Sequence, residues 1–148
     1  QMCIRDRLGH VGSVDKILTS ELKKRIDKGF IPVIAPIGKS NEGHYLNINA
    51  DVVAGEVAQV LKAEKLILLT DVKGIGDSDN KLISNITLKK GENLLKKKFI
   101  KGGMTPKLTS ALEAKKRGVK SCHIIDGRVP HAVLLEVLTE EGVGTMIS

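Results

Sequence analysis

Residues 65–76 read KLILLTDVKGIG, and this stretch decides the fold. The run 66–69 is apolar without interruption, which is typical of a strand buried on both faces of a parallel sheet. A polar Thr-Asp pair follows, and two closely spaced glycines then supply a tight turn. Such a turn at the carboxyl end of a strand lets backbone amides approach a phosphate group or a base closely. On its own, however, the pattern is more often an ordinary connection between a strand and a helix.

Helical patterns lie on both sides of this strand. Upstream, residues 51–65 (DVVAGEVAQVLKAEK) place valines on one helical face, and Asp51 lies where an acidic residue favours a helix N-terminus. Downstream, residues 101–118 (KGGMTPKLTSALEAKKRG) predict a helix with Thr105 as its cap and Pro106 in its first turn.

The rest of the chain continues the alternation. Thr19 or Ser20 is the expected cap of the first helix, and the apolar run 30–38 (FIPVIAPIG) is expected to form a short buried strand. The other predicted strands are 44–50, 119–126 and 142–147, and the other predicted helices are 21–28, 88–98 and 130–138. Strands alternating with helices predict an α/β fold, with three layers (α/β/α) and a mostly parallel central sheet.

Length and composition narrow the class of protein. The chain has 148 residues, of which 41% are hydrophobic and 28% charged, as in one ordinary globular domain. No apolar stretch approaches the roughly 20 residues that a membrane span needs. The cysteines Cys3 and Cys122 have no metal-ligand spacing and make no disulfide framework. We therefore expect a cytoplasmic protein with no membrane partner.

The charge pattern argues against a nucleic-acid partner. The net charge is +7, but only three residues are aromatic (Phe30, Tyr45 and Phe99), so no stacking surface for single strands exists. The basic residues are spread over several segments, and the lysines of 89–101 are interpreted as a solvated helix face. A small anionic ligand such as a nucleotide triphosphate would also suit a basic surface.

A first candidate site is Asn47-Ile48-Asn49-Ala50-Asp51. Alternation along a strand puts Asn47 and Asn49 on one face, and Asp51 follows as a helix begins. These groups are suited to orienting a polar substrate and a cationic partner. Turn and helix-cap chemistry explains the same spacing equally well.

A second candidate site is Lys101-Gly102-Gly103, directly before the predicted helix. Consecutive glycines there expose free N–H groups at the positive end of the helix dipole, which suits an anion. Lys107 in the first turn is electrostatically unfavourable, and such a breach of a local rule indicates function. The alternative is an exposed helical lysine.

These segments, taken in order, resemble the C-terminal half of the acetylglutamate kinases, a branch of the amino acid kinase family. The resemblance covers residues 8–148. It is carried by the strings GHVGSV (9–14), IPVIAPIG (31–38), LNINADVVAGEVA (46–58), LILLTDVKGI (66–75), GGMTPKL (102–108) and HIIDGRVPHAVLLEVLTEEGVGTMI (123–147).

The resemblance implies transfer of the γ-phosphate of ATP to the side-chain carboxylate of N-acetyl-L-glutamate, a step of arginine biosynthesis, with Mg²⁺ as the companion of ATP. It implies catalytic roles for Lys107 and Asp51, and substrate binding by Asn47 with its neighbour Asn49. The residues expected to contact ATP are Asp71, Val72, Lys73, Gly74, Ile75, Gly76, Phe99, Ile100, Lys101, Gly102 and Gly103.

The chain also departs from this family. A complete member is longer, and its N-terminal lobe carries a first catalytic lysine, a Gly-Gly loop and a substrate-binding arginine that we do not find here. We therefore expect a foreign leader at 1–7, a remnant of that lobe at 8–46 and a nucleotide-binding lobe at 47–148. Missing strands would leave apolar surface uncovered, and the 148 residues alone should be inactive. A full-length form is expected to be a homo-oligomer.

The C-terminal string resembles the arginine-sensitive members of the family. That likeness implies that His123, Glu136 and Gly142 line a feedback site for arginine, where a carboxylate suits a guanidinium. The alternative is a core histidine beside a solvated helical glutamate.

Three other functions are weaker interpretations of this sequence. A different amino acid kinase, acting on aspartate, glutamate, carbamate or uridylate, is disfavoured by NINAD and HIIDGRVPH. A non-catalytic module that binds nucleotide or arginine is consistent with a single lobe. Nucleic-acid binding is the least favoured.

Overall fold

The computed structural model describes residues 11–96, 99–139 and 142–148. Its main sheet has four strands in the order β3-β5-β6-β4. Strand β3 (Lys65–Thr70) lies parallel to β5 (Ser121–Asp126), β5 lies antiparallel to β6 (Gly144–Ile147), and β6 lies parallel to the short β4 (Asn85–Ile86). The predicted leader at 1–7 and the lysines at 97–98 lie outside the described residues.

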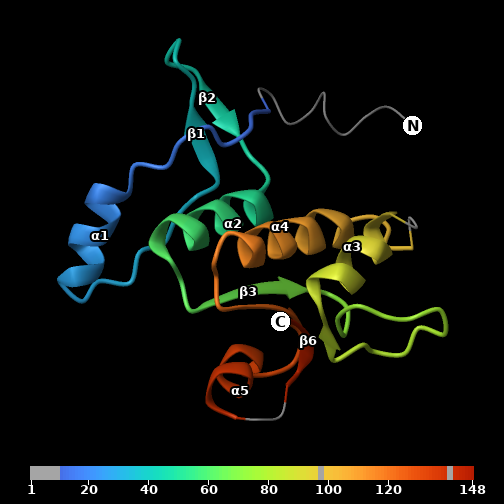
Figure 1. The fold of residues 1–148 in the computed structure, drawn as a ribbon. Helices are drawn as coiled ribbons and strands as arrows, with labels where there is room; N and C mark the ends of the chain where they lie inside the picture. Colours follow the sequence, from blue (N-terminus) through green and yellow to red (C-terminus); the bar gives the residue numbers. More distant parts are fainter. Residues whose placement is uncertain (1–10, 97–98, 140–141) are drawn as a thin grey trace.

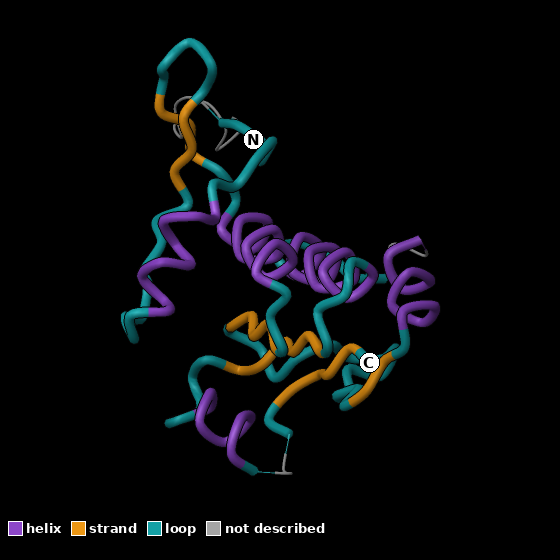
Figure 2. Tube along the Cα trace, turned by 60° about the vertical axis from the view of Figure 1, so that its left-hand side comes forward, coloured by secondary structure: helices purple, strands orange, loops and turns teal. Residues whose placement is uncertain are grey.

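Helices cover both faces of this sheet. Helices α2 (Ala50–Leu61), α3 (Leu88–Lys96) and α4 (Met104–Lys116) lie on one face, and α5 (Ala132–Leu138) lies on the other (Figures 1 and 2). The mixed, mostly parallel sheet and the three layers confirm the predicted fold class.

The core lies between α4 and the sheet. Leu108 and Ala111 on α4 are fully buried, and so is Ile124 in the middle of β5. Burial of each large apolar side chain contributes about 1.5–3 kcal/mol. The glycine at 91 allows α3 to come close to α4, because a Cβ there would lie 2.7 Å from Leu112 Cδ2. This packing fixes the N-terminus of α4 near the carboxyl edge of the sheet.

The N-terminal segment forms helix α1 (Thr19–Asp27) and a small antiparallel hairpin, β1 (Ile37–Lys39) and β2 (Tyr45–Asn47), which projects from the layers (Figure 1). The prediction of a buried strand over 30–38 is wrong, since only its last two residues lie in β1. Ile31 and Val33 are 91% and 97% exposed. Among the described residues no strand pairs with 30–36, so no sheet buries the run. The expected uncovered apolar surface is therefore confirmed.

Two predicted helix caps are also wrong. Helix α1 begins at Thr19 itself, with Leu18 in the cap position and no side-chain cap. Helix α4 begins at Met104, two residues earlier than a Thr105 cap allows, and Gly103 takes the cap position. The Thr105 hydroxyl instead donates a hydrogen bond to the carbonyl oxygen of Ile100, at 3.2 Å.

Candidate active site

The parallel pairing of β3 and β5 brings two strand ends to one edge of the sheet. Thr70 is opposite Asp126, and each is the last residue of its strand. The loop that starts at Asp71 and the loop that starts after Asp126 therefore leave the sheet side by side. Ligands of open α/β sheets bind at this edge.

A pocket of about 470 Å³ lies at this edge. It brings together two segments that are far apart in the sequence, 71–77 and 99–101. Nine of the predicted nucleotide residues line it: Asp71, Val72, Lys73, Gly74, Ile75, Gly76, Phe99, Ile100 and Lys101. Its volume is within the range of about 300–1,000 Å³ that small-molecule sites occupy.

The lining of the pocket is suited to a nucleotide. Apolar groups from Leu82, Phe99 and Met104 face it, as do the cationic residues Lys73 and Lys101. A base or sugar could lie against the apolar groups, and phosphates could lie against the cations.

A hydrogen-bonded turn closes the far side of the pocket. Asp77 Oδ1 accepts hydrogen bonds from the backbone N–H groups of Asp79 and Lys81, both at 2.9 Å. The carbonyl oxygen of Asp77 accepts a further bond from Asn80 N–H, at 3.0 Å. Asp77 and Asn80 both line the pocket, although the sequence reading did not single them out.

Arg128 is a pocket residue that sequence reasoning missed. Its Nε and Nη2 atoms donate to Asp126 Oδ1 and Oδ2, at 2.9 and 2.8 Å. This bidentate contact, together with a hydrogen bond from the Arg128 backbone N–H, lowers the pKa of Asp126 from 3.8 to about 2. The signal was the Asp-Gly-Arg string at the end of β5, which we read only as part of the family resemblance.

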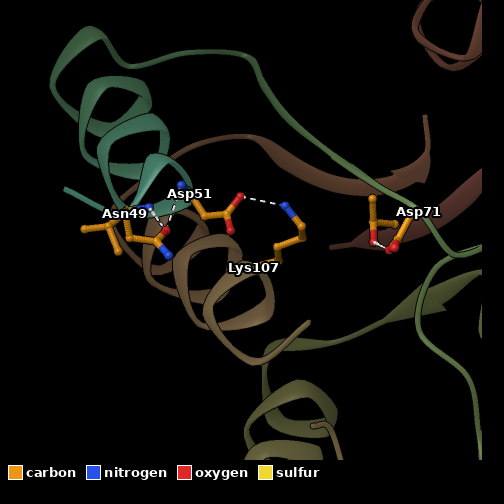
Figure 3. A network of polar contacts seen from close by, with 6 residues as sticks. Asn49, Asp51, Asp71 and Lys107 are labelled. Atoms are coloured by element: carbon orange, nitrogen blue, oxygen red, sulfur yellow. Dashed lines mark hydrogen bonds and ion pairs between the residues drawn. The ribbon is translucent and has the colours of Figure 1, made fainter. Parts of the chain in front are cut away.

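Asp51 and Lys107 meet in an ion pair. Asp51 lies in the first turn of α2 and Lys107 near the start of α4, and the two helices pack side by side. Lys107 Nζ lies 2.8 Å from Asp51 Oδ1, and the side chains are only 21% and 17% exposed (Figure 3). Lys107 follows the pocket residue Met104 by three positions, so both lie on one face of α4. The carboxylate offsets the unfavourable position of a cation in the first helical turn.

Lys107 lies between Asp51 and Asp71 in Figure 3, with its ammonium group directed at Asp51. The Asp71 carboxylate accepts a 3.4 Å hydrogen bond from the Thr70 hydroxyl. Neither residue of the ion pair lines the pocket, but Met104, three positions before Lys107 on the same helix, does.

Asn47 and Asn49 have different surroundings, so the prediction that they share a strand face is wrong. Strand β2 ends at Asn47. Asn49 is the cap of α2, and its Oδ1 accepts hydrogen bonds from the N–H groups of Asp51 and Val52, at 2.9 and 3.3 Å. This capping ends the extended backbone and fixes Asp51 at the helix start. The cap interpretation thus holds for Asn49, and Asn47 is an exposed residue at the end of the hairpin.

Gly102 and Gly103 lie between the pocket residues Lys101 and Met104 but do not line the pocket. Both are exposed, and Gly102 has the left-handed backbone that favours glycine (φ 60°). They form the turn that connects the pocket to α4.

The three residues of the predicted feedback site come together on the other face of the sheet. His123 Nδ1 lies 2.5 Å from Glu136 Oε1, and the side chains are 5% and 8% exposed. Glu136 Oε2 accepts a hydrogen bond from Val143 N–H, at 2.9 Å, and Gly142 lies beside the same oxygen. The expectation of a solvated glutamate is therefore wrong, whereas a buried histidine with its hydrogen bonds satisfied fits what is seen.

The described residues show neither a metal-binding cluster nor a membrane-spanning helix. They contain no group of three or more His, Cys, Asp or Glu side chains that could hold a metal ion by itself. No helix among them is long and apolar enough to cross a membrane.

Comparison with known proteins identifies the family. The model of the amino acid kinase family matches residues 1–126, which is most of the chain. The chain belongs to the amino acid kinase family. Its sequence is 54% identical over 140 residues to the acetylglutamate kinase of Nitrosomonas eutropha, covering 95% of this chain and 48% of that protein. It is 53% identical over 141 residues to the acetylglutamate kinase of Saccharophagus degradans, with 95% and 47% covered. The chain spans about half the length of these curated relatives.

Solved structures show the same fold. The N-acetylglutamate synthase from Neisseria gonorrhoeae, solved with coenzyme A and N-acetyl-glutamate, superposes with a TM-score of 0.87 at 29% identity, covering 94% of this chain and 32% of that one. The carbamate kinase from Giardia lamblia bound to AMP-PNP superposes with a TM-score of 0.73 at 21% identity, covering 93% and 46%, and this likeness concerns the fold alone.

Proposed function

We propose that this chain provides the nucleotide-binding part of an acetylglutamate kinase, which transfers the γ-phosphate of ATP to the side-chain carboxylate of N-acetyl-L-glutamate in arginine biosynthesis. The observation that carries the proposal is the partly buried Asp51–Lys107 ion pair, whose lysine lies on the helix that begins at the pocket residue Met104; the pocket has a volume of about 470 Å³. The identity of about half of the residues to curated acetylglutamate kinases supports it. Residues 47–148 form the nucleotide lobe in this proposal, and residues 8–46 belong to the substrate lobe.

The reaction needs position and positive charge more than covalent help from the protein. An oxygen of the substrate carboxylate forms a bond to the γ-phosphorus, the bond from that phosphorus to the β,γ-bridging oxygen breaks, and ADP leaves. Negative charge on the transferring group is spread over its equatorial oxygens. The Lys107 ammonium, directed by Asp51, stabilises that charge more in the transition state than in the ground state.

ATP lies in the pocket, with its phosphates toward Lys73 and Lys101 and the base toward Phe99. Mg²⁺ supplies additional neutralisation of phosphate charge when it is bound. Asp71 and Asp77, which line the pocket, would hold the ion together with the phosphates.

The acceptor substrate lies near the end of the hairpin. Asn47 is exposed there and offers an amide to N-acetyl-L-glutamate. Asn49 has its oxygen engaged as a helix cap, so it contributes through its amide nitrogen and by fixing Asp51. The complete enzyme is cytoplasmic and forms a homo-oligomer in this proposal.

Steady-state kinetics of a full-length enzyme containing this segment test the assignment. Lys107→Ala removes an ammonium group that stabilises the transition state more than the ground state. The kcat should therefore fall about a hundred- to a thousand-fold, which corresponds to about 3–4 kcal/mol of activation free energy. The KM for N-acetyl-L-glutamate should stay within a few-fold of the original. Asp51→Ala should also lower kcat, because Lys107 loses its anchor, and Asn47→Ala should mainly raise the KM for the acceptor.

The matched control is Lys90→Ala, which removes an exposed lysine from α3 and should leave the kinetics unchanged. A surface role for Lys107 would predict a change in stability of under about 0.5 kcal/mol and hardly any change in rate. A Lys107→Ala enzyme that retains a third of the original kcat would end the assignment.

We also infer that the cluster of His123, Glu136 and Gly142 is a feedback site for arginine. The Glu136 carboxylate is held in place by His123 and by Val143 N–H, and a carboxylate can accept further hydrogen bonds from a guanidinium. The supporting observation is that His123 of β5 and the loop residues Gly142 and Val143 all lie against the Glu136 carboxylate of α5.

A non-catalytic binding module is the second candidate, because one lobe could bind ATP without turnover. The high identity to curated kinases argues against it as the function of the complete protein. Nothing in the described residues favours nucleic-acid binding.

A further inference from the structure

Thr145 is a buried polar residue in the middle of an apolar strand. It lies in β6 opposite Ile124 of β5, and it is 1% exposed. Its hydroxyl oxygen accepts a hydrogen bond from the backbone N–H of Ile75, at 2.9 Å. The two residues are 70 positions apart in the sequence. A side chain of the sheet thus holds the backbone of the loop that lines the pocket.

The loop lies directly against this hydroxyl. Gly74 has a positive φ of 137°, and a Cβ built on it would be 2.8 Å from Thr145 Oγ1 and 2.7 Å from Leu82 Cδ1. The side chain of Ile75 is 1% exposed, and its carbonyl oxygen accepts a hydrogen bond from Ile83 N–H, at 2.8 Å. The backbone of Ile75 is therefore held by two hydrogen bonds. One joins its N–H group to Thr145 of β6, and the other joins its carbonyl oxygen to Ile83, which follows the turn at 77–81.

We infer that Thr145 is a positioning residue that sets the conformation of the pocket loop 71–77, and through it the affinity for ATP. The part that concerns ATP rests on the proposed function. A buried N–H group without an acceptor is costly, so an apolar residue at 145 would force the loop to move until Ile75 finds another partner. Asp71 and Lys73, which line the pocket on the same loop, would move with it.

Amide hydrogen exchange of the 148-residue chain, followed by NMR, tests the positioning without any ligand. Thr145→Val nearly keeps the shape of the side chain but removes the acceptor. Protection of the Ile75 amide should fall about tenfold or more, the ratio expected for loss of one ordinary hydrogen bond. Protection of the Leu68 and Ile124 amides should be retained. Thr145→Ser keeps the hydroxyl and should restore the protection of Ile75.

The matched control is Thr109→Val, the same chemical change at an exposed position of α4, where the hydroxyl bonds only to the carbonyl of Thr105. It should leave Ile75 unchanged. If Thr145→Val does not fold, Gly74→Ala disturbs the same contact from the side of the loop and should lower Ile75 protection in the same selective way. Unchanged protection of Ile75, equal loss at Leu68 and Ile124, or failure of Thr145→Ser to restore it would each overturn the inference.

Calorimetric titration with MgATP adds the functional readout. Thr145→Val should weaken ATP binding about tenfold, Thr145→Ser should bind like the original chain, and the KM for N-acetyl-L-glutamate of a full-length enzyme should not change. If the original chain and the full-length enzyme both fail to bind ATP, the proposed function is wrong, and the exchange experiment still decides the role of Thr145. ATP binding that is equal in the original chain and in Thr145→Val would overturn the link to ATP affinity.

Discussion

At the level of single residues, charge in the pocket depends on the pairing of Asp126 with Arg128. Asp126 is 5% exposed at the end of β5, and its carboxylate is covered by the guanidinium that lines the pocket. The pair keeps Arg128 fixed, since two parallel hydrogen bonds restrict the fork of the guanidinium. Asp71 also raises the pKa of Arg128, after the larger effect of Asp126. The position of one cation that lines the pocket is thus set by a neighbour two residues away.

The pairing of Asp126 with Arg128 predicts that the free energy of unfolding depends on pH. The pKa of Asp126 is lowered from 3.8 to about 2, so the folded chain holds the carboxylate ionised where the unfolded chain protonates it. The stabilisation is present above pH 3.8 and is lost as the pH falls toward about 2. Denaturant unfolding across this range should show a decline in the free energy of unfolding, and Asp126→Asn should make that decline smaller. The control Asp79→Asn, at an exposed turn position, should keep it. An unchanged decline in Asp126→Asn would contradict the assignment of the pair.

At the level of elements, helix α5 and strand β6 are joined through Glu136. The carboxylate contacts His123 of β5 and Val143 directly before β6, so one side chain connects three elements. The same strand, two residues after Val143, carries the hydroxyl that holds the pocket loop. The proposed arginine site and the pocket therefore share β6.

Arginine titration of a full-length enzyme tests the proposed feedback site. Arginine at millimolar concentration should inhibit, and Glu136→Gln should raise the half-inhibitory concentration about tenfold or more, because a charge-assisted contact with the guanidinium is lost. The control Glu42→Gln changes an exposed carboxylate in the β1–β2 hairpin and should leave inhibition unchanged. Absence of inhibition in the original enzyme would rule out the site.

At the level of the whole molecule, the four-stranded sheet with its helices is well packed, whereas the segment before β1 is not. The sheet and its helices bury a core in which Leu108, Ala111 and Ile124 are inaccessible to solvent. The segment before β1, by contrast, leaves Ile31 and Val33 almost fully exposed. Exposed apolar surface of this kind marks a place where another part of a protein packs.

We therefore expect the 148-residue chain by itself to bind ATP but to show no acetylglutamate kinase turnover. The family resemblance implies a first catalytic lysine and a substrate-binding arginine that we do not find in this sequence, and phosphoryl transfer depends on positive charge placed around the transferring group. A coupled assay for ADP, run beside a full-length homologue and beside calorimetric titration with MgATP, measures both. Turnover near that of the homologue would show that the chain is catalytically sufficient.

The sequence by itself determined the elements whose signals are local. The apolar run at 66–69, the alternation of strands and helices and the glycine turn at 74–76 led to the correct fold class and to the pocket loop at 71–76, whereas the family resemblance supplied Phe99 and Ile100. These signals can be read from the sequence, because the repeat of apolar residues, the residues of a tight turn and the carboxyl end of a parallel strand are properties of the local backbone. The local pattern marked Asp51 and Lys107 as candidates, the family resemblance assigned them catalytic roles, and these roles stay predictions.

Only the tertiary structure decided the features that depend on a distant partner. Thr145 gave no local signal, because the loop that its hydroxyl holds lies 70 positions away in the sequence. Asn49 turned out to cap a helix, although alternation had placed it beside Asn47. The run 30–36 carries the apolar pattern of a buried strand but lies exposed, because burial requires a second surface and the pattern alone cannot supply one.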